Sequence, residues 1–263
     1  MLDYDNEAER YDATRGGEPR ADAAAAAISS LLPGSARDVV DVACGTGIVT
    51  VRLVTDGRSV RGVDRSPGMA AYAALRLPGR IAVGDVTRLP LASGSADAVT
   101  MVWLLHLLSA DAAARAVAEA ARVLPPGGLL ITTVNKNDAE YSDADDASAL
   151  ARRLRETVPD PQADDLARVL SIARAAGLDT AGPAAAGPGT CVSGATFTGL
   201  GQGRTPGQWA KRLASGHVPW TKAAGQSRMD ALYEELAALP GQDRPRPDPV
   251  YRLAALRKTG APA

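Results

Sequence analysis

Over the first half of the chain, short apolar runs alternate with longer stretches in which apolar residues recur every three to four positions. The short runs are rich in β-branched residues and have the length of strands, whereas the longer stretches have helical spacing. The strand-like runs occupy residues 37–44, 58–64, 80–85, 95–105 and 127–134. Between them the pattern predicts helices over about 46–56, 66–76 and 111–123. Strands separated by crossover helices form a parallel, buried sheet, so the sequence predicts an α/β fold with a doubly wound sheet.

After residue 135 this alternation fades, and helical stretches are interrupted by prolines and glycines. One amphipathic helix is predicted to end near Pro159, and a second to stop at Gly177. Two further strands are predicted within 190–199 and 248–258, with broken helical sequence between them. We interpret residues 1–263 as a single domain whose first half is a regular scaffold and whose second half carries insertions that shape a pocket.

Charge and cysteine content exclude several classes of protein. The chain has 29 basic and 30 acidic residues, which leaves no electrostatic surplus for binding a nucleic acid. Cys44 and Cys191 lie far apart and match no metal or disulfide spacing, as is typical of a reducing compartment. The first residues lack the apolar core of a signal peptide, and no apolar run approaches the roughly 20 residues that span a bilayer. We expect a cytoplasmic protein with no nucleic-acid partner, no membrane partner and no metal site.

The stretch VVDVACGTGIVT, residues 39–50, places two glycines where the first strand ends and a helix is expected to begin. Because Gly45 and Gly47 have no Cβ, they allow a tight turn and let a ligand touch the main chain. A dinucleotide-binding turn would have a third glycine where Thr50 stands. Asp41 would repel a pyrophosphate but attract an ammonium or a sulfonium. The motif therefore argues against NAD, while a tight turn that binds no ligand stays an alternative.

Three aspartates stand at the ends of three successive predicted strands. Asp41 ends the first strand, Asp64 ends the second at 19 residues after Gly45, and Asp85 ends the third. Ligands of open α/β sheets bind outside the carboxyl ends of the strands, so these side chains are expected to converge on one crevice. A carboxylate at the end of the second strand can accept hydrogen bonds from both hydroxyls of a ribose. Each aspartate alone could be a solvated loop charge, but three in register favour a ligand site.

Four segments follow one another in order within residues 37–134: DVACGTGIVT, VRGVDRSPGMAAYA, VGDVTRLPLASGSADAVTMVWLLHLL and EAARVLPPGGLLITT. Together they resemble the successive motifs of class I S-adenosylmethionine-dependent methyltransferases, in particular the UbiE-like branch that acts on small molecules. The resemblance implies a Rossmann-like, seven-stranded sheet of order 3-2-1-4-5-7-6 whose last strand is antiparallel. It also implies helical lid segments over 1–35, a cofactor-binding core over 36–134 and cap insertions in a substrate-shaping half over 135–263.

The same resemblance assigns residues to the cofactor, S-adenosylmethionine. Its methionine part would lie among Asp41, Ala43, Gly45 and Gly47, where Ala43 replaces a glycine common in the family and leaves slightly less room. Asp64 would hold the ribose hydroxyls. The other core contacts would be made by Arg65 and Met69 beside the adenine, Asp85 at the adenine amino group, the Val86 N–H at the ring, and the backbone of Trp103 and Leu104 over the methionine and sulfonium.

The N-terminal stretch YDNEAERYDATRGG resembles the short helix that covers the cofactor in such enzymes. Tyr4, Tyr11 and Arg15 are its candidate contact residues, with Arg15 as the partner of the methionine carboxylate. The alternative for all three is a solvated helix face.

Methyl transfer is an in-line displacement at an already activated carbon. Catalysis can therefore consist of holding the acceptor about 3 Å from the methyl group and excluding water. His106, just beyond the fourth strand, is the candidate base or orienting donor, and an ordinary packed histidine is the alternative. His217 is interpreted as a surface or cap residue. The scarce aromatic residues available to line an acceptor pocket are Trp103, Trp209, Trp220, Tyr141 and Phe197.

Three functions are consistent with the sequence. The first is methylation of O, N or C on a small-molecule acceptor, as a tailoring step on a secondary metabolite, by a monomer or homodimer. The second is an S-adenosylmethionine-binding protein without catalysis, which uses nearly the same residues. The third is an NAD-dependent oxidoreductase on a doubly wound sheet, against which Thr50 and Asp41 argue.

Overall fold

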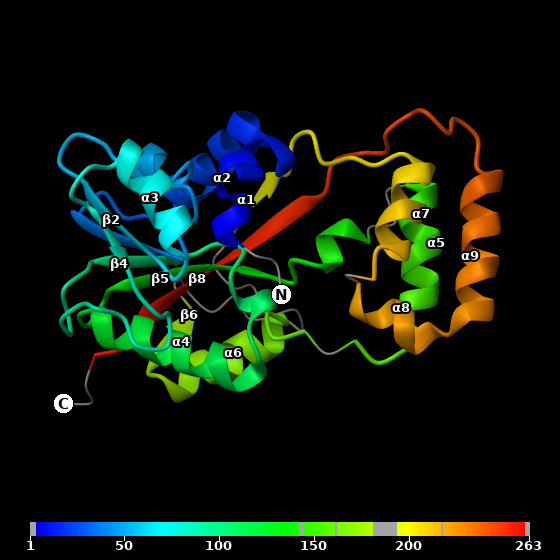
Figure 1. Ribbon diagram of the computed structural model, residues 1–263. Helices are drawn as coiled ribbons and strands as arrows, with labels where there is room; N and C mark the ends of the chain where they lie inside the picture. Colours follow the sequence, from blue (N-terminus) through cyan, green and yellow to red (C-terminus); the bar gives the residue numbers. More distant parts are fainter. Residues whose placement is uncertain (1–3, 142–144, 161, 181–193, 217, 261–263) are drawn as a thin grey trace.

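The computed structural model describes residues 4–260 apart from 142–144, 161, 181–193 and 217. Its centre is a single sheet in the order β3-β2-β1-β4-β5-β8-β6, with β7 also paired to β8 (Figure 1). The first five strands run parallel to their neighbours, and β8 is antiparallel to β5, β6 and β7. Their bounds are Asp38–Val42 for β1, Ser59–Asp64 for β2, Ile81–Val83 for β3, Ala98–Met101 for β4, Leu129–Val134 for β5, Leu178–Thr180 for β6, Gly194–Thr198 for β7 and Val250–Lys258 for β8.

This sheet confirms the predicted fold class and strand order, with β8 in the place of the predicted antiparallel last strand. The sheet has eight strands among the described residues, whereas seven were expected. Two short strands share one edge of β8: Thr180 of β6 pairs with Leu256, and Gly194 of β7 pairs with Ala254. Residues 178–180 and 194–198 thus occupy the place of one sixth strand, which was predicted within 190–199. Residues 190–193 of that prediction lie outside the described residues.

Helices cover both faces of the sheet. On one face, α2 (Gly17–Leu31) and the short 3-10 helix η1 (Thr50–Leu53) pack on a core that includes Val39, Val60 and Ile131. On the other, α4 (Ala110–Val123) and α6 (Leu166–Ala175) pack on Val40, Val99 and Leu130. Every residue of β5 is buried, as expected for a strand covered on both faces. The predicted helices 66–76 and 111–123 are confirmed as α3 (Pro67–Arg76) and α4.

The predicted helix over 46–56 is wrong, because only the 3-10 turn η1 forms there. The segment GIVTVRLV contains five β-branched residues, which lose side-chain freedom in an α-helix. Two other contacts replace helical bonds: the Thr50 hydroxyl donates to Asp41, and the Arg52 guanidinium pairs with Glu18 and Asp22 of α2. The helix α2 packs beside η1 on this face of the sheet.

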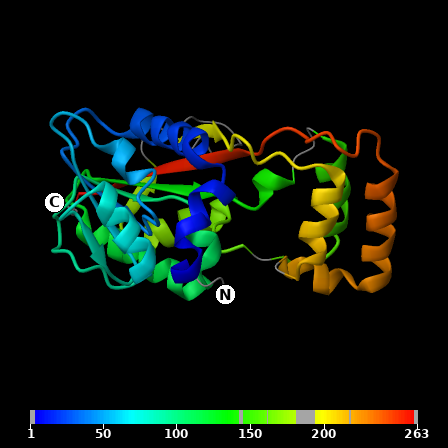
Figure 2. The same ribbon diagram turned by 45° about the horizontal axis from the view of Figure 1, so that its top comes forward.

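Four helices form a separate lobe beside the carboxyl ends of the central strands (Figures 1 and 2). They are α5 (Asp146–Arg155), α7 (Pro206–Ala214), α8 (Pro219–Ala224) and α9 (Gln226–Ala238). The lobe has its own apolar core, in which Trp209 and Leu232 are buried and the Trp220 indole donates to the Tyr141 hydroxyl at 3.0 Å. Tyr141, Trp209 and Trp220 thus pack inside the lobe. We call this four-helix lobe the cap.

No helix in the described part of the chain is long and apolar enough to span a membrane.

Candidate cofactor and acceptor site

The glycine turn after β1 needs its two glycines for different reasons. Gly45 has φ 55° and Gly47 has φ 74°, which lie in a backbone region that residues other than glycine rarely adopt. A Cβ added to Gly45 would have no heavy atom within 4 Å, whereas one added to Gly47 would lie 3.0 Å from the Ala73 Cβ. Gly47 therefore lets α3 approach the turn, and Gly45 leaves its main chain open to a ligand.

Ala43, the departure from the family pattern, has a conformational consequence. Its φ is 60°, so an L-residue stands in the conformation that glycine adopts freely. The turn is held by the Ala43 and Cys44 N–H groups, which both donate to the Val63 carbonyl, at 2.7 and 3.2 Å. The sequence argument considered only the size of this side chain, but the backbone conformation accounts for a glycine at this position.

Asp41 lies beneath the turn and faces threonines. Its Oδ2 accepts from the Thr50 hydroxyl at 2.6 Å and its Oδ1 from the Thr100 hydroxyl at 2.7 Å. Burial raises the pKa of this carboxyl to about 6, although both hydroxyls lower it. The residue at the third glycine position of the dinucleotide motif is thus a hydrogen-bond partner of Asp41. This side chain joins β1, β4 and η1, and a direct contact of Asp41 with a cofactor stays a prediction.

Asp64 joins the end of β2 to the glycine turn. Its Oδ2 accepts from the Gly45 N–H at 2.8 Å and its Oδ1 from the Ser66 N–H at 2.9 Å. Burial raises the pKa of this carboxyl, while the backbone donors oppose the rise. The Arg65 N–H is a third backbone donor to this carboxylate, so of its about four lone-pair sites roughly one stays open to a further donor. Contact of Asp64 with a ribose stays a prediction.

The predicted adenine residues lie beyond β2 and β3. Asp85 is exposed, and its Oδ1 accepts from the N–H and hydroxyl of Thr87, both at 2.7 Å, which lowers its pKa. Arg65 is exposed and lies close enough to Asp85 to lower that pKa further. Met69 and Val86 are buried. These residues line the carboxyl edge of the sheet beside Asp64, and their contacts with adenine stay predictions.

The N-terminal helix α1 (Tyr4–Thr14) is anchored over the turn by two carboxylates. Asp5 accepts from the Ser66 hydroxyl at 2.5 Å and from the Gly68 N–H at 2.8 Å. Asp12 accepts from the Thr46 hydroxyl at 2.6 Å and pairs with Arg76 at 2.7 Å. The helix is therefore tied to both the glycine turn and α3.

The candidate residues of this segment lie together. The rings of Tyr4 and Tyr11 are 6.2 Å apart, and the Arg15 guanidinium lies 5.6 Å from the Tyr11 ring centre. Burial raises the pKa of Tyr4, as do the nearby Tyr11 and, to a smaller extent, the Asp64 carboxylate. Tyr4 is thus within electrostatic range of the proposed ribose site.

Trp103 turns the chain at the carboxyl end of β4. It has φ 56°, and its N–H donates to the Thr133 hydroxyl at 2.8 Å. Its ring packs edge-on against Phe197 and Tyr251, with centroids 5.6 and 5.8 Å away. Leu104 is buried, so its side chain belongs to the core and only its backbone is a candidate contact.

His106 follows in η2 (Leu105–Leu107) with its ring partly exposed and its Nδ1 buried. Burial lowers the pKa of this imidazole to about 3, and the nearby Lys136 ammonium lowers it further. A general base works best when its pKa lies near the operating pH, so an imidazole with this pKa is a poor base at neutral pH. Burial therefore weakens the case for a base, and both predicted roles, base and orienting group, stay predictions.

We expect the free energy of unfolding to decrease as the pH falls from about 7.5 to 5. In His106→Gln this decrease should be smaller by about 2 kcal/mol. The unfolded imidazole takes up its proton near pH 6.5 and the folded one only near 3. This contribution is therefore present above pH 6.5 and is lost as the pH falls toward 3. Urea unfolding of both proteins at the two pH values measures the difference. An equal fall in the variant would mean that folded His106 is already protonated at pH 5.

A group of charged residues that the sequence did not predict lies beside His106. The Glu140 carboxylate of η3 (Asp138–Glu140) is buried, and three cations reach it. Lys136 Nζ lies 2.9 Å from Oε1, while Arg212 and Arg204 lie 2.7 and 3.4 Å from Oε2. A fourth cation, Arg20 of α2, stacks on Trp103 with its guanidinium carbon 3.4 Å from the ring centre. We call Arg20, Lys136, Arg204 and Arg212, together with Glu140, the cationic cluster.

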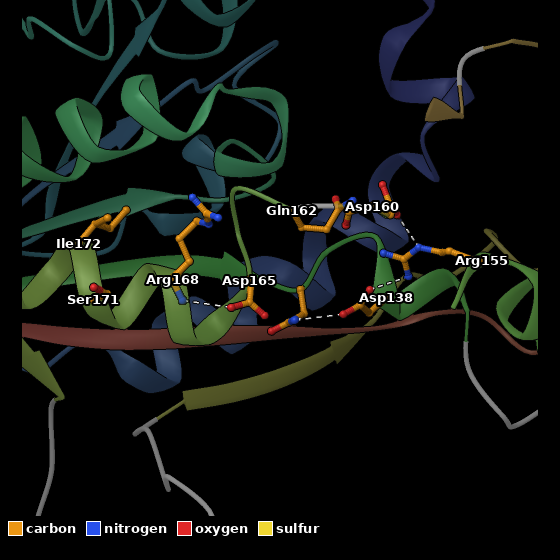
Figure 3. Close-up of a pocket in the computed structure, with 9 residues that line it drawn as sticks. Asp138, Arg155, Asp160, Gln162, Asp165, Arg168, Ser171 and Ile172 are labelled. Atoms are coloured by element: carbon orange, nitrogen blue, oxygen red, sulfur yellow. Dashed lines mark hydrogen bonds and ion pairs between the residues drawn. The ribbon is translucent and has the colours of Figure 1, made fainter. Parts of the chain in front are cut away.

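A groove of about 620 Å³ near the cap is a different feature (Figure 3). Figure 3 shows the Arg155 guanidinium pairing with Asp138 and Asp160, at 2.7 and 2.6 Å. Asp165 accepts from the Arg168 N–H at the start of α6. Since these charges pair within the groove and none of the predicted site residues lines it, we assign it no ligand. Its lining consists of Asn135, Asp138, Arg155, Asp160, Gln162, Asp165, Arg168, Ser171 and Ile172.

Comparisons with known proteins agree with this fold. Residues 40–132 match a family model described as a methyltransferase domain. An uncharacterized methyltransferase of Mycobacterium tuberculosis is 42% identical over 113 residues, which cover 43% of this chain and 45% of the relative. The demethylmenaquinone methyltransferase of Beutenbergia cavernae is 44% identical over 94 residues, which cover 35% and 38%. The matched segment thus spans less than half the length of these relatives.

Among solved structures, an S-adenosylmethionine-dependent methyltransferase of Thermotoga maritima has a TM-score of 0.55 at 18% identity, covering 97% of this chain and 98% of the other. At this identity the likeness concerns the fold. Together the domain match and the fold identify residues 40–132 as a methyltransferase domain on a Rossmann-like sheet. The curated relatives that match this segment include demethylmenaquinone methyltransferases.

Proposed function

We propose that this protein is an S-adenosylmethionine-dependent methyltransferase that acts on a small-molecule acceptor, as a tailoring step on a secondary metabolite. The observation that carries the proposal is the buried Asp64 carboxylate at the end of β2, which accepts from the Gly45 N–H of the glycine turn at 2.8 Å. It lies beside the open main chain of the glycine turn, within electrostatic range of Tyr4. The demethylmenaquinone methyltransferase relatives act on a small molecule by their name, which supports this acceptor class.

Bound S-adenosylmethionine supplies an activated methyl group on a sulfonium sulfur. Asp64 holds the ribose hydroxyls, Gly45 lets the main chain approach the methionine part, and α1 covers the site from solvent. The acceptor lies between Trp103, His106 and the cap, where side chains fix its position and exclude water. The buried Nδ1 of His106 makes no hydrogen bond within the described chain, so it is free to orient a polar group of the acceptor.

The NAD-dependent alternative is less consistent with the geometry. A dinucleotide pyrophosphate binds at the N-terminus of a helix that follows the glycine turn. Here that place is taken by the four-residue 3-10 helix η1, and Thr50 is committed to Asp41. Binding without catalysis is favoured by one observation, the pKa of His106 near 3, because it leaves this candidate base weak. An acceptor that loses no proton before transfer needs no base. A methyltransferase and a protein that only binds S-adenosylmethionine would therefore differ in turnover alone.

Calorimetry with S-adenosylhomocysteine and NAD tests the cofactor assignment. We expect one molecule of S-adenosylhomocysteine to bind per chain and NAD to produce no saturable heat, because the turn offers an open main chain but no helix terminus. Binding of NAD without S-adenosylhomocysteine would overturn the proposal. Release of S-adenosylhomocysteine from S-adenosylmethionine in the presence of an acceptor then separates an enzyme from a binding protein.

A further inference from the structure

The cationic cluster carries more positive charge than its acidic neighbours balance. Glu140 contacts three of its cations and lies within electrostatic range of the fourth, Arg20. Asp164 is the other buried acid within range of Lys136, but it accepts from the Lys136 N–H, and burial raises its pKa. Four cations therefore face at most two carboxylates, and only Glu140 forms ion pairs with them among the described residues.

This charge surplus is mostly shielded from solvent, although the Arg204 and Arg212 side chains are 23% and 31% exposed. Arg20 is only 8% exposed, and the Lys136 and Glu140 side chains are 15% and 5% exposed. Burial lowers the pKa of Arg20, Lys136 and Arg204. Buried charges are costly unless they are paired and hydrogen-bonded, so a site with this surplus favours an anion as its ligand.

Unsatisfied nitrogens gather at the same place. Three buried N–H donors make no hydrogen bond within the described chain: Arg20 Nε, Trp103 Nε1 and Arg212 Nε. The buried His106 Nδ1 is also without a partner, and His106 is within electrostatic range of Lys136, Glu140 and Arg20. Two buried acceptors of this region, Glu140 Oε2 and Asp164 Oδ1, also make no hydrogen bond, but both lie in range of the cations of the cluster. Buried donors almost always have a partner in folded proteins, so the orphan donors point to a ligand with acceptor oxygens.

The cluster also lies where an acceptor should bind. Trp103 and His106 follow β4, Lys136 and Glu140 follow β5, and Arg204 and Arg212 belong to the cap side of the chain. All of these lie beyond the carboxyl ends of the central strands, which is where open α/β sheets bind their ligands. The stack of Arg20 on Trp103 fixes the guanidinium in place, and the Arg20 Nη1 donates to the Arg15 carbonyl at 2.7 Å.

We propose that the cationic cluster binds a carboxylate or phosphate group of the methyl acceptor, so that the substrates of this protein are organic anions. The inference rests on the proposed function and adds the substrate class. Arg212 and Arg204 hold the anionic group from the cap, Arg20 and the Trp103 indole N–H hold it from the sheet, and Glu140 pairs with the other three cations, Lys136, Arg204 and Arg212. The rest of the acceptor then extends toward the methyl group past His106.

The test uses the whole protein saturated with S-adenosylhomocysteine and titrated with three probes: benzoate, inorganic phosphate and the neutral isostere benzamide. We expect at least one of the two anions to bind, and benzamide to bind at least about tenfold more weakly than that anion, because charge-assisted hydrogen bonds are lost. Preference for benzoate or for phosphate distinguishes a carboxylate acceptor from a phosphorylated one. Neither anion binding better than benzamide would overturn the proposal.

Single variants locate the binding. Arg212→Gln and Arg204→Gln should each weaken anion binding by about tenfold and leave S-adenosylhomocysteine affinity unchanged. Arg153→Gln is the matched control, since this exposed cap arginine pairs with Glu235 at the surface. Glu140→Gln should tighten anion binding, because it removes the competing carboxylate. Melting temperatures of all variants show which of them are folded.

Two results separate this inference from the cofactor assignment. If the arginine variants weaken S-adenosylhomocysteine instead of benzoate, the cluster holds the methionine carboxylate, and the inference is wrong while the proposed function stands. If the wild-type protein does not bind S-adenosylhomocysteine, the proposed function fails. Titration of the cofactor-free protein with benzoate then still measures the anion site.

Discussion

Replacing Glu140 by glutamine is expected to lower the free energy of unfolding by about 3–5 kcal/mol, the usual loss when one partner of a buried ion pair is removed. The carboxylate is 5% exposed and is contacted by Lys136, Arg212 and Arg204. Glutamine has nearly the same shape, so the change removes charge and leaves the packing in place. The cations then face one another without the carboxylate between them. Urea unfolding at neutral pH measures the loss.

A surface pair in the cap supplies the control. Glu235 pairs with Arg153, and these side chains are 43% and 67% exposed. Glu235→Gln should cost at most about 1 kcal/mol, since exposed ion pairs contribute little. If Glu140→Gln lowers the free energy of unfolding no more than Glu235→Gln does, water screens the cationic cluster in the folded protein. The charge surplus would then not favour an anionic ligand. Benzoate at about 100 times its dissociation constant should restore about 2.7 kcal/mol to the variant if the anion site is real.

The decrease in the free energy of unfolding at acidic pH should also depend on the Glu140 carboxylate. Although burial alone would raise the pKa of Glu140, the cations Lys136, Arg212 and Arg204 hold it at about 2, below the ordinary 4.5. A depressed carboxyl pKa stabilises the folded state above pH 4.5, and this contribution is lost as the pH falls toward 2. Glu140→Gln should flatten the curve in that window, whereas His106→Gln flattens it between 6.5 and 3.

The sheet could be predicted from sequence because its strands are nearly continuous β-branched runs bounded by glycine and proline. The five strand-like runs correspond to β1 to β5, and 248–258 to β8. The prediction of a helix over 46–56 was wrong because it gave helical spacing more weight than β-branching. In addition, Thr50 contacts Asp41 and Arg52 contacts α2, and such tertiary contacts cannot be predicted from local sequence. The split of the sixth strand depends on pairing with β8, which spacing alone does not reveal.

The three aspartates were predicted to converge, and the structure refines what each one does. Asp41 and Asp64 lie in electrostatic contact at the ends of β1 and β2, and Asp85 stands at the exposed edge beyond β3. The sequence could place them at strand ends because parallel strands end on the same edge. It could not show that Asp41 is sealed by two threonines, since Thr100 is 59 residues away.

The cationic cluster was missed for a topological reason. Its members come from α2, the segment after β5, the loop before α7, and α7 itself, so no local spacing connects them. One signal was available. Arg20 stands in GEPRADAAAAAISS on the same helical face as the buried Ala24 and Ala27. A single arginine on an otherwise apolar helix face is a reason to look for a buried partner or ligand.

Replacing Asp64 by asparagine is expected to weaken S-adenosylhomocysteine binding by about 100-fold, equivalent to about 3 kcal/mol. The variant loses the charge that strengthens hydrogen bonds from two ribose hydroxyls. It also replaces one acceptor oxygen by an NH₂ donor, which then faces the N–H of either Gly45 or Ser66. The glycine turn and the ribose site are therefore both affected, and the loss should exceed that of a residue touching the ligand alone.

Asp85→Asn is the matched control at the end of the next strand. That carboxylate is exposed and holds only the N–H and hydroxyl of Thr87, so its replacement should weaken binding by no more than about tenfold. Calorimetry on the three proteins gives the affinities, and thermal melts separate a disturbed turn from an unfolded chain. If Asp64→Asn binds S-adenosylhomocysteine as tightly as the wild type, Asp64 does not hold the ribose. Its carboxylate would then serve only to fix Gly45, and the cofactor would have to be held by α1 and the main chain of the turn.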